Sequence, residues 1–171
     1  MSARAVLALG ANLGDRLAAL QGAIDLLDGT DGVAVVAVSD VYETAPVGGP
    51  DQGDFLNAVV AVQTDLDPRQ LLAVCHGIER AWDRRRDVRW GPRTLDVDIV
   101  IFGDVEMDEP DLTLPHPRAV TRAFVCVPWL DVDAEAAVPR AGLIADVVST
   151  LDASGIRARP DLALVVPGGV R

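Results

Sequence analysis

The sequence predicts a single α+β domain in which helices pack on an antiparallel sheet. Two kinds of segment lead to this class: some alternate apolar and polar residues, as strands do, and others repeat apolar residues at helical spacing. The order in which the two kinds follow one another is the third observation. At 171 residues the chain is long enough to bury a sizeable core, and half of its residues are hydrophobic. Residues 1–171 are therefore expected to form one domain, in which the pattern assigns no role to the residues after about 153.

The predicted elements follow from the apolar spacing and from the residues that end each segment. Apolar residues between Leu17 and Leu27 recur at helical spacing, and Pro68 favours the first turn of a second helix. The βαββαβ order of the elements is typical of the ferredoxin-like fold, with the helices on one face of the sheet. In chain order the sequence predicts a strand at 5–9, a helix that ends at 29–32, strands at 33–42 and 56–62, a helix at 68–82 and a strand at 96–102.

The connecting segments are also marked by composition. Residues 43–54 are rich in Gly and Pro and predict an ordered loop rather than a tight hairpin. Residues 109–117 predict a loop marked by proline, and helices are expected at 119–130 and 142–151.

The chain is acidic overall, and its basic residues are of one type and clustered. A net charge of −11 argues against a protein that coats nucleic acid. Every basic residue other than histidine is arginine, so a Walker-type phosphate loop, which needs lysine, is excluded. Six arginines gather in one segment, and guanidinium groups bind phosphate oxygens in pairs. A solvated helix end is the alternative for these residues, which are Arg80, Arg84, Arg85, Arg86, Arg89 and Arg93.

The cysteines and the hydropathy of the chain indicate where in the cell the protein is located. Cys75 and Cys126 lie in apolar segments, which favours free buried thiols in a reducing environment. No apolar run approaches the length needed to span a bilayer, and the first residues lack the pattern of a secretory signal. We therefore expect a cytoplasmic protein.

The most informative segment is residues 90–98, Trp-Gly-Pro-Arg-Thr-Leu-Asp-Val-Asp. Because a strand alternates faces, Asp96 and Asp98 leave on one side with Cα atoms about 7 Å apart, while Leu95, Val97 and Ile99 face a core. Two neighbouring carboxylates repel one another unless a cation compensates, and Mg²⁺ binds carboxylates together with phosphate oxygens. Such a pair can hold two ions in phosphoryl transfer. The alternative is a strand face with two solvated acids, against which Arg93 and the arginine segment argue.

Several cationic side chains are candidates for phosphate contacts. No spacing of Ser, His and Asp or of Cys and His indicates a covalent nucleophile, and phosphoryl transfer requires only positioning and charge neutralisation. His116 lies between two prolines and either donates to a phosphate oxygen or makes a structural hydrogen bond. His76 lies in the middle of a predicted helix and is expected to be structural or peripheral. The candidates are Arg84, Arg86, Arg93, His116 and Arg122.

The few aromatic residues suggest a site for a flat ring. Phe55, Trp90 and Phe124 each neighbour polar residues, and a heterocycle stacks favourably on such rings. The amide of Asn57 offers a donor and an acceptor to the edge of a heterocycle. The alternative is that these rings belong to the core.

Together these residues resemble the family of 6-hydroxymethyl-7,8-dihydropterin pyrophosphokinases. The resemblance covers nearly all of residues 5–130 in order, and the segment around 90–98 is its most specific part. It rests on residues 10–15, 42–46, 51–57, Glu79, Arg84, Arg86, 90–98, 112–118, Arg122 and Phe124.

The resemblance implies an activity and a role for each matched position. ATP would give its terminal diphosphate to the hydroxymethyl oxygen of the pterin, releasing AMP, in a step of folate biosynthesis. Asp96 and Asp98 would hold two Mg²⁺ ions. Arg84 and Arg86 would lie on a loop that closes over the reacting groups. The implied catalytic residues are Arg84, Arg86, Arg93 and His116. The implied pterin residues are Thr44, Ala45, Val47, Phe55, Asn57, Trp90 and Phe124. The implied ATP residues are Glu79, Arg84, Arg93, Ile99, Leu112, Thr113, His116 and Arg122. The resemblance also implies a monomer that binds neither nucleic acid nor membrane.

The chain departs from the family pattern at three positions. Asp83 and Arg85 replace the glycine and the small apolar residue that often flank the first loop arginine, and Ala45 replaces a frequent proline. Two other functions stay open on the residues alone. One is a two-metal nucleotidyl transferase of the polymerase-palm type, and the other is a regulatory module that binds a small ligand without turnover.

Overall fold

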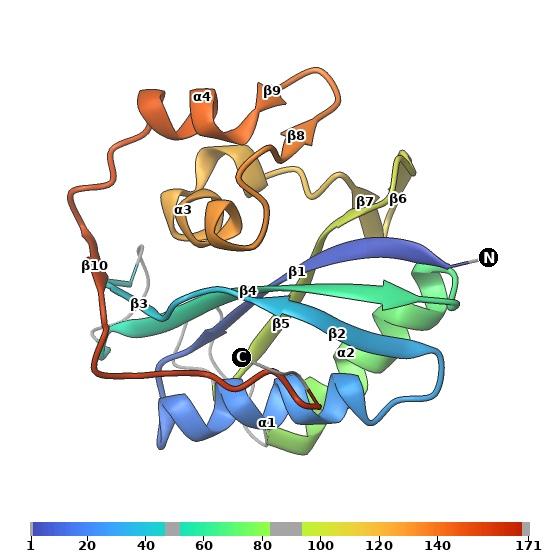
Figure 1. Ribbon diagram of the computed structural model, residues 1–171, viewed down its shortest axis with the longest axis horizontal. Helices are drawn as coiled ribbons and strands as arrows, with labels where there is room; N and C mark the ends of the chain where they lie inside the picture. The colour runs from blue at the N-terminus through green and yellow to red at the C-terminus, as the bar shows by residue number, and fades with distance from the viewer. Residues whose placement is uncertain (1, 47–51, 83–93, 169–171) are drawn as a thin grey trace.

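A computed structural model of the chain describes residues 2–46, 52–82 and 94–168. Over these residues the chain forms three layers, with the sheet between two groups of helices (Figure 1). Helices α1 (Arg16–Asp28) and α2 (Pro68–Trp82) cover one face, and α3 (Ala123–Val132) and α4 (Ile144–Thr150) lie over the other. Among the described residues, no helix is both long and apolar enough to cross a membrane.

The central sheet has the strand order of a ferredoxin-like fold, which confirms the predicted class. The order is β10-β3-β4-β1-β5, and β2 also pairs with β4. All of these pairs are antiparallel, and the β1–β4 pair runs without interruption from Ala3↔Thr64 to Ala11↔Leu56. The strands are β1 (Ala3–Ala11), β2 (Val33–Val38), β3 (Tyr42–Thr44), β4 (Phe55–Thr64), β5 (Asp96–Phe102) and β10 (Ile156–Ala158).

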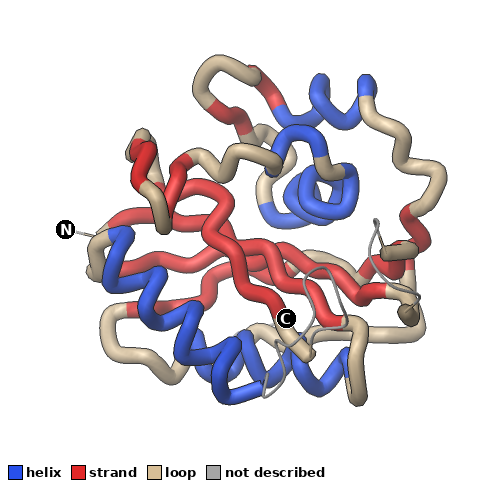
Figure 2. The backbone as a smooth tube through the Cα atoms, turned by 180° about the vertical axis from the view of Figure 1, so that it is seen from behind, coloured by secondary structure: helices blue, strands red, loops and turns tan. Residues whose placement is uncertain are grey.

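The two faces of the sheet form two separate cores. Leu7, Leu56 and Leu95 pack with α1 and α2, whereas Val59 and Trp129 belong to the core beneath α3. The two helices of the predicted βαββαβ order, α1 and α2, cover one face as expected. Helices α3 and α4 cover the other, because β1 and β4 are apolar on both faces and require cover on both. Figure 2 shows the strands between the two groups of helices from behind.

Local hydrogen bonds explain where the elements begin and end. Helix α1 begins after Asp15, whose carboxylate accepts the N–H of Ala18 at 3.0 Å, as an N-cap does. The strand expected over 33–42 is interrupted at Ser39, whose Oγ accepts the N–H of Val59 at 2.8 Å. A side-chain oxygen there takes the place of a backbone acceptor, so β2 ends and β3 begins at Tyr42.

The later segments are more divided than the sequence predicts. The expected loop 109–117 includes most of a hairpin of β6 (Met107–Glu109) and β7 (Leu112–Leu114). The helix expected at 119–130 is divided into a short 3-10 turn, η1 (Ala119–Thr121), and α3, with Arg122 extended between them. The strands β8 (Ala137–Val138) and β9 (Gly142–Leu143) form a small hairpin before α4.

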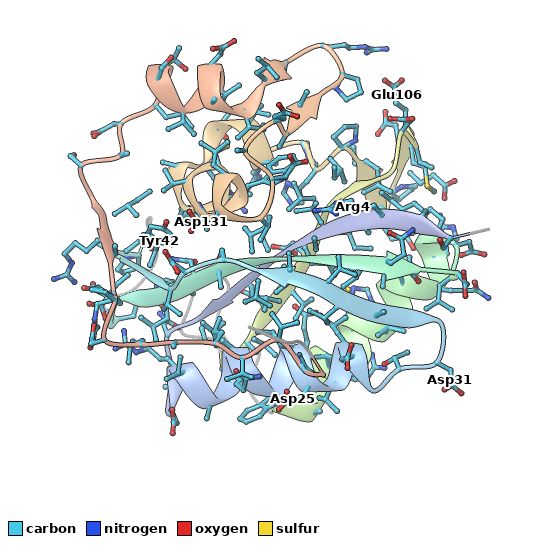
Figure 3. All side chains as sticks on the ribbon, in the orientation of Figure 1. Arg4, Asp25, Asp31, Tyr42, Glu106 and Asp131 are labelled. Carbon is cyan, nitrogen blue, oxygen red and sulfur yellow. The ribbon has the colours of Figure 1, made fainter. Side chains whose placement is uncertain are left out.

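Helix α3 is tied to the sheet by a polar contact at its exposed end. The hydroxyl of Tyr42 on β3 donates to Asp131 Oδ2 at 2.7 Å, and the N–H of Asp40 donates to the same oxygen at 3.2 Å. Figure 3 labels Tyr42 on β3 and Asp131 on α3 close to each other. Burial and the neighbouring Asp131 carboxylate raise the pKa of Tyr42, so its hydroxyl keeps the proton that it donates.

The segment after residue 153, to which the sequence assigned no role, crosses the end of the sheet and then follows α1. Strand β10 pairs with β3, and Leu164 is buried in the core beside α1. Gln21 on α1 both donates to and accepts from the backbone of Val165, at 3.0 and 2.8 Å. The carboxyl-terminal residues therefore form part of the folded domain, and they pass below the sheet in Figure 1.

Candidate active site

The carboxylates Asp96 and Asp98 lie on β5 as the alternation predicts. Leu95, Val97 and Ile99 are at most 3 % exposed and pack in the core of α1 and α2. Asp98 is exposed and Asp96 half-buried, on the opposite side of the strand. Within the described residues no three His, Cys, Asp or Glu side chains form a metal cluster. A protein nevertheless commonly supplies only one or two carboxylate ligands to Mg²⁺, and water and phosphate oxygens complete the coordination.

His116 lies beside this carboxylate pair because a backbone hydrogen bond holds its loop against β5. Its N–H donates to the carbonyl of Val100 at 2.8 Å. Burial lowers the pKa of His116, the Asp98 carboxylate opposes this shift, and the Arg122 and Arg118 guanidinium groups add to it. Nδ1 accepts the N–H of Arg118 at 3.1 Å, so in the neutral ring we assign the proton to Nε2. The ring can then donate one hydrogen bond from Nε2.

Arg122 brings a positive charge to the same carboxylates from the start of α3. Burial lowers its pKa, and Asp98 and Asp96 oppose that shift. An arginine stays protonated under these conditions. Its guanidinium carbon lies 5.5 Å from the centre of the Phe124 ring, which places the charge over an aromatic face. Arg122 therefore lies between the carboxylate pair and one of the predicted ring-binding residues.

A cavity of about 250 Å³ lies beside β5, the edge strand of the sheet. Five of the residues expected to bind ATP line it, together with Asp98. Those five residues are Glu79, Ile99, Leu112, Thr113 and His116. Glu79 is buried on α2 and accepts the N–H of Val97 at 3.1 Å, which fixes α2 against β5. Arg122 is not among the lining residues.

His76 also lines this cavity, although sequence reasoning placed it outside the site. The missed signal is helical spacing, because residues three or four apart share a face of a helix. Leu72, His76 and Glu79 follow that spacing, and all three line the cavity. The resemblance had drawn attention to Glu79 alone.

The residues expected to bind the flat ring gather at the ends of β3 and β4. Thr44 pairs with Phe55 and Tyr42 with Asn57. Asn57 Nδ2 donates to Thr44 Oγ1 at 2.8 Å, and both side chains are buried. A Cβ at Gly10 would lie 3.3 Å from Asn57 Oδ1 and 3.7 Å from the Phe55 ring, so glycine leaves room for the two side chains. Phe124 packs against the core beneath α3, on the face that Phe55 and Asn57 share. Ala45 is exposed just after Thr44.

Five expected site residues fall in segments 47–51 and 83–93. Val47, Arg84, Arg86, Trp90 and Arg93 lie outside the described residues, as do Asp83 and Arg85. The expectations for them remain predictions from the sequence.

Fold and site together define an α+β protein with a carboxylate pair on β5, a cavity beside it, and cationic and aromatic side chains nearby. Comparisons with known proteins identify the family. Residues 6–134 match the model of the 7,8-dihydro-6-hydroxymethylpterin-pyrophosphokinase (HPPK) family. The chain is 42% identical over 153 residues to the 2-amino-4-hydroxy-6-hydroxymethyldihydropteridine pyrophosphokinase of Methylorubrum extorquens, covering 90% of this chain and 96% of that one. It is 50% identical over 150 residues to the protein of the same name from Mycobacterium leprae, covering 81% and 76%.

Solved structures agree on the fold. A Plasmodium falciparum HPPK-DHPS triple mutant with pteroate superposes with a TM-score of 0.70 at 16% identity, over 92% of this chain and 47% of that chain. The present chain thus spans about half the length of those larger proteins. The chain belongs to the HPPK family, and it is an ATP-dependent pyrophosphokinase. Membership excludes the polymerase-palm and regulatory-module alternatives.

Proposed function

We propose that the chain transfers the diphosphate of ATP to the hydroxymethyl oxygen of 6-hydroxymethyl-7,8-dihydropterin, a step of folate biosynthesis, at the site formed by β5, the cavity beside it and the ends of β3 and β4. One observation carries this assignment of the site. Five of the six described residues expected to bind ATP line one cavity with Asp98, whereas most of those expected to bind the pterin lie at the ends of β3 and β4. Arg122 acts electrostatically on Asp98 and Asp96 and lies over the ring of Phe124, a residue expected to bind the pterin.

The reaction is a substitution at the β-phosphorus of ATP. The hydroxymethyl oxygen forms a bond to that phosphorus, the bond to the oxygen bridging the α- and β-phosphates breaks, and AMP leaves with that oxygen. The hydroxyl proton passes to solvent or to a phosphate oxygen. Because such transition states are loose, the protein contributes mainly by positioning and by neutralising charge.

Asp96 and Asp98 would hold two Mg²⁺ ions, which supply charge neutralisation at the phosphate oxygens when bound. Their hard oxygen donors suit this ion. His116 donates from Nε2 to a phosphate oxygen, and Arg122 binds a second anionic oxygen. Arg84, Arg86 and Arg93 add further guanidinium groups to the triphosphate. Glu79, Ile99, Leu112 and Thr113 line the cavity for the rest of the nucleotide.

The pterin ring would stack between Phe55 and Phe124, with Asn57 contacting the polar edge of the ring. The Thr44–Asn57 hydrogen bond holds the amide in one orientation for that contact. Ala45, Val47 and Trp90 complete this pocket in the proposal.

We further propose that residues 1–171 act as one domain and as a monomer in the cytoplasm. Sedimentation of the purified protein tests whether it is a monomer.

The experiment that tests the function identifies the nucleotide product. Purified protein with MgATP and the hydroxymethyl dihydropterin is expected to release AMP, and release of ADP or of no nucleotide product would contradict the proposal.

Asp98→Asn is expected to abolish turnover while pterin affinity stays within about twofold, because the ring pocket lies on other strands. Asp104→Asn, an exposed aspartate just beyond β5, is the matched control and is expected to retain activity. Removing divalent ions with EDTA should stop AMP formation, and added Mg²⁺ should restore it.

A further inference from the structure

Three arginines from distant parts of the chain converge on Glu43, a buried carboxylate of β3. Arg16 Nη1 donates to Glu43 Oε2 at 2.7 Å, and Arg157 Nη2 donates to Oε1 at 2.8 Å. Arg159 Nη1 lies 3.2 Å from Oε2. The Arg16 guanidinium holds the pKa of Glu43 below its ordinary value, with further help from Arg159 and Arg157, so the carboxylate is ionised.

The same arginines extend the cluster to two further carboxylates. Arg157 Nη2 also donates to Asp54 Oδ2 at 3.0 Å, and Arg159 pairs with Asp161 at 2.7 Å. Three positive and three negative side chains therefore balance one another around Glu43. A buried carboxylate is tolerated when its charge is paired and its oxygens accept hydrogen bonds, and both conditions hold here.

This cluster lies directly behind the proposed ring pocket. Glu43 precedes Thr44 on β3, and Asp54 precedes Phe55 on β4. Because strand residues alternate faces, Glu43 faces the α1 side while Thr44 faces the pocket side. Arg16 Nη1 also donates to the carbonyl of Asp54 at 2.9 Å. The cluster thus fixes the ends of both strands that carry the ring-binding side chains.

The carboxyl-terminal segment supplies two of the three arginines. Strand β10 pairs with β3 in the register Ile156↔Thr44, Arg157↔Glu43 and Ala158↔Tyr42. This segment lies beyond residues 6–134, where the chain matches the family model. Like Arg16, Arg157 bridges the two strand ends, but it does so between two carboxylates, since one of its nitrogens bonds both Glu43 and the Asp54 side chain.

We infer that Arg157 is a positioning residue for the pterin: it does not touch the ring, but through Glu43 and Asp54 it holds Thr44 and Phe55 in the geometry that binds the ring. The inference rests on the proposed function, because it takes those residues as the pterin pocket. The ATP cavity lies at the other edge of the sheet, so Arg157 affects the pterin and leaves ATP binding unchanged.

The test compares Arg157→Gln with Arg140→Gln, a matched control. Arg140 has a side chain 88% exposed and pairs only at 3.7 Å with Glu106 among its described ion pairs. Arg157→Gln should raise the KM for pterin about fivefold, which is ~1 kcal/mol, while the KM for ATP stays within twofold. The control should change neither KM. Arg157→Lys should restore most of the pterin affinity, because a single ammonium can bridge the two carboxylates that one guanidinium nitrogen bridges now.

A purely structural role predicts another pattern: a lower melting temperature with both KM values unchanged. That pattern, or equal increases in both KM values, would overturn the inference. A double-mutant cycle with Asp54→Asn supplies a second criterion, since residues that act through one another give non-additive changes. The pterin KM of the double variant should equal that of the weaker-binding single variant, and additive changes would contradict the proposed bridge.

The proposed function is tested separately by the wild-type protein, which must form AMP. If wild-type turnover were absent, titration with the pterin and α,β-methylene-ATP, whose methylene bridge blocks transfer, would still compare pterin binding in wild type and Arg157→Gln. A fivefold difference there supports the positioning role even where the reaction assignment fails. Equal affinities overturn the positioning role by themselves.

Discussion

The hydrogen bond between Asn57 and Thr44 predicts a linked loss of stability and of pterin affinity. Thr44→Val removes the hydroxyl that accepts from Asn57 Nδ2 at 2.8 Å but nearly preserves the shape of the side chain. Both residues are buried, with exposed fractions of 5% for Asn57 and 7% for Thr44, so water cannot readily replace the lost acceptor. An unsatisfied buried donor costs about 2 kcal/mol. For a domain of this size the melting temperature should fall by about 4–8 °C.

The same change releases the amide of Asn57 to rotate, and the contact proposed between this amide and the polar edge of the ring should then be lost. We expect the KM for pterin to rise about tenfold, which is the effect of losing ~1.4 kcal/mol of binding free energy. Thermal unfolding and steady-state kinetics measure the two effects. The control is Thr150→Val, because Thr150 is exposed and its hydroxyl only donates to the carbonyl of Val147. A melting temperature and a pterin KM equal to those of the control would refute the reasoning.

Two further predictions concern His76 and His116, which both line the cavity beside β5. Since burial lowers the pKa of His116 in the folded state, the unfolded state binds a proton more readily, so stability should fall as the pH drops below about 6.5, the ordinary histidine value. Melting curves between pH 7.5 and pH 5 measure this loss, and His116→Gln should reduce it; an equal loss in the variant would contradict the assignment. His76→Ala should raise the KM for ATP about threefold and leave the KM for pterin unchanged, because His76 lines the cavity proposed for the nucleotide. Initial rates at varied ATP decide this, and an effect on the pterin alone would exclude the assignment.

Much of the fold could be predicted because the relevant signals are local. The second helix was predicted at the residues where α2 lies, since Pro68 marks its first turn and its apolar residues share a face. The interruption of the strand at Ser39 could not be predicted, because it depends on a bond to Val59, twenty residues away. The cover on the second face of the sheet also depends on distant contacts, since Trp129 packs with Val6 and Val59.

The candidate site also has a part that local sequence predicts and a part that depends on distant contacts. The directions of Asp96 and Asp98 follow from the alternation of one strand, whereas the place of His76 in the cavity beside β5 depends on how α2 packs against that strand. The convergence of Arg16, Arg157 and Arg159 on Glu43 was also beyond sequence reasoning. These residues lie up to 116 positions from Glu43, and no spacing rule relates them.

Alternation on β3 also explains why the proposed ring pocket and the ion pairs of Glu43 lie on opposite faces of the sheet. Thr44 faces the pocket, so its neighbour Glu43 must face α1, where Arg16 and the carboxyl-terminal arginines meet it. A shift of β3 by one residue would exchange these faces and place a carboxylate beside the ring. The ladder with β10 and the ion pairs of Glu43 both oppose such a shift. The carboxyl-terminal segment therefore fixes the register that the proposed pterin pocket requires.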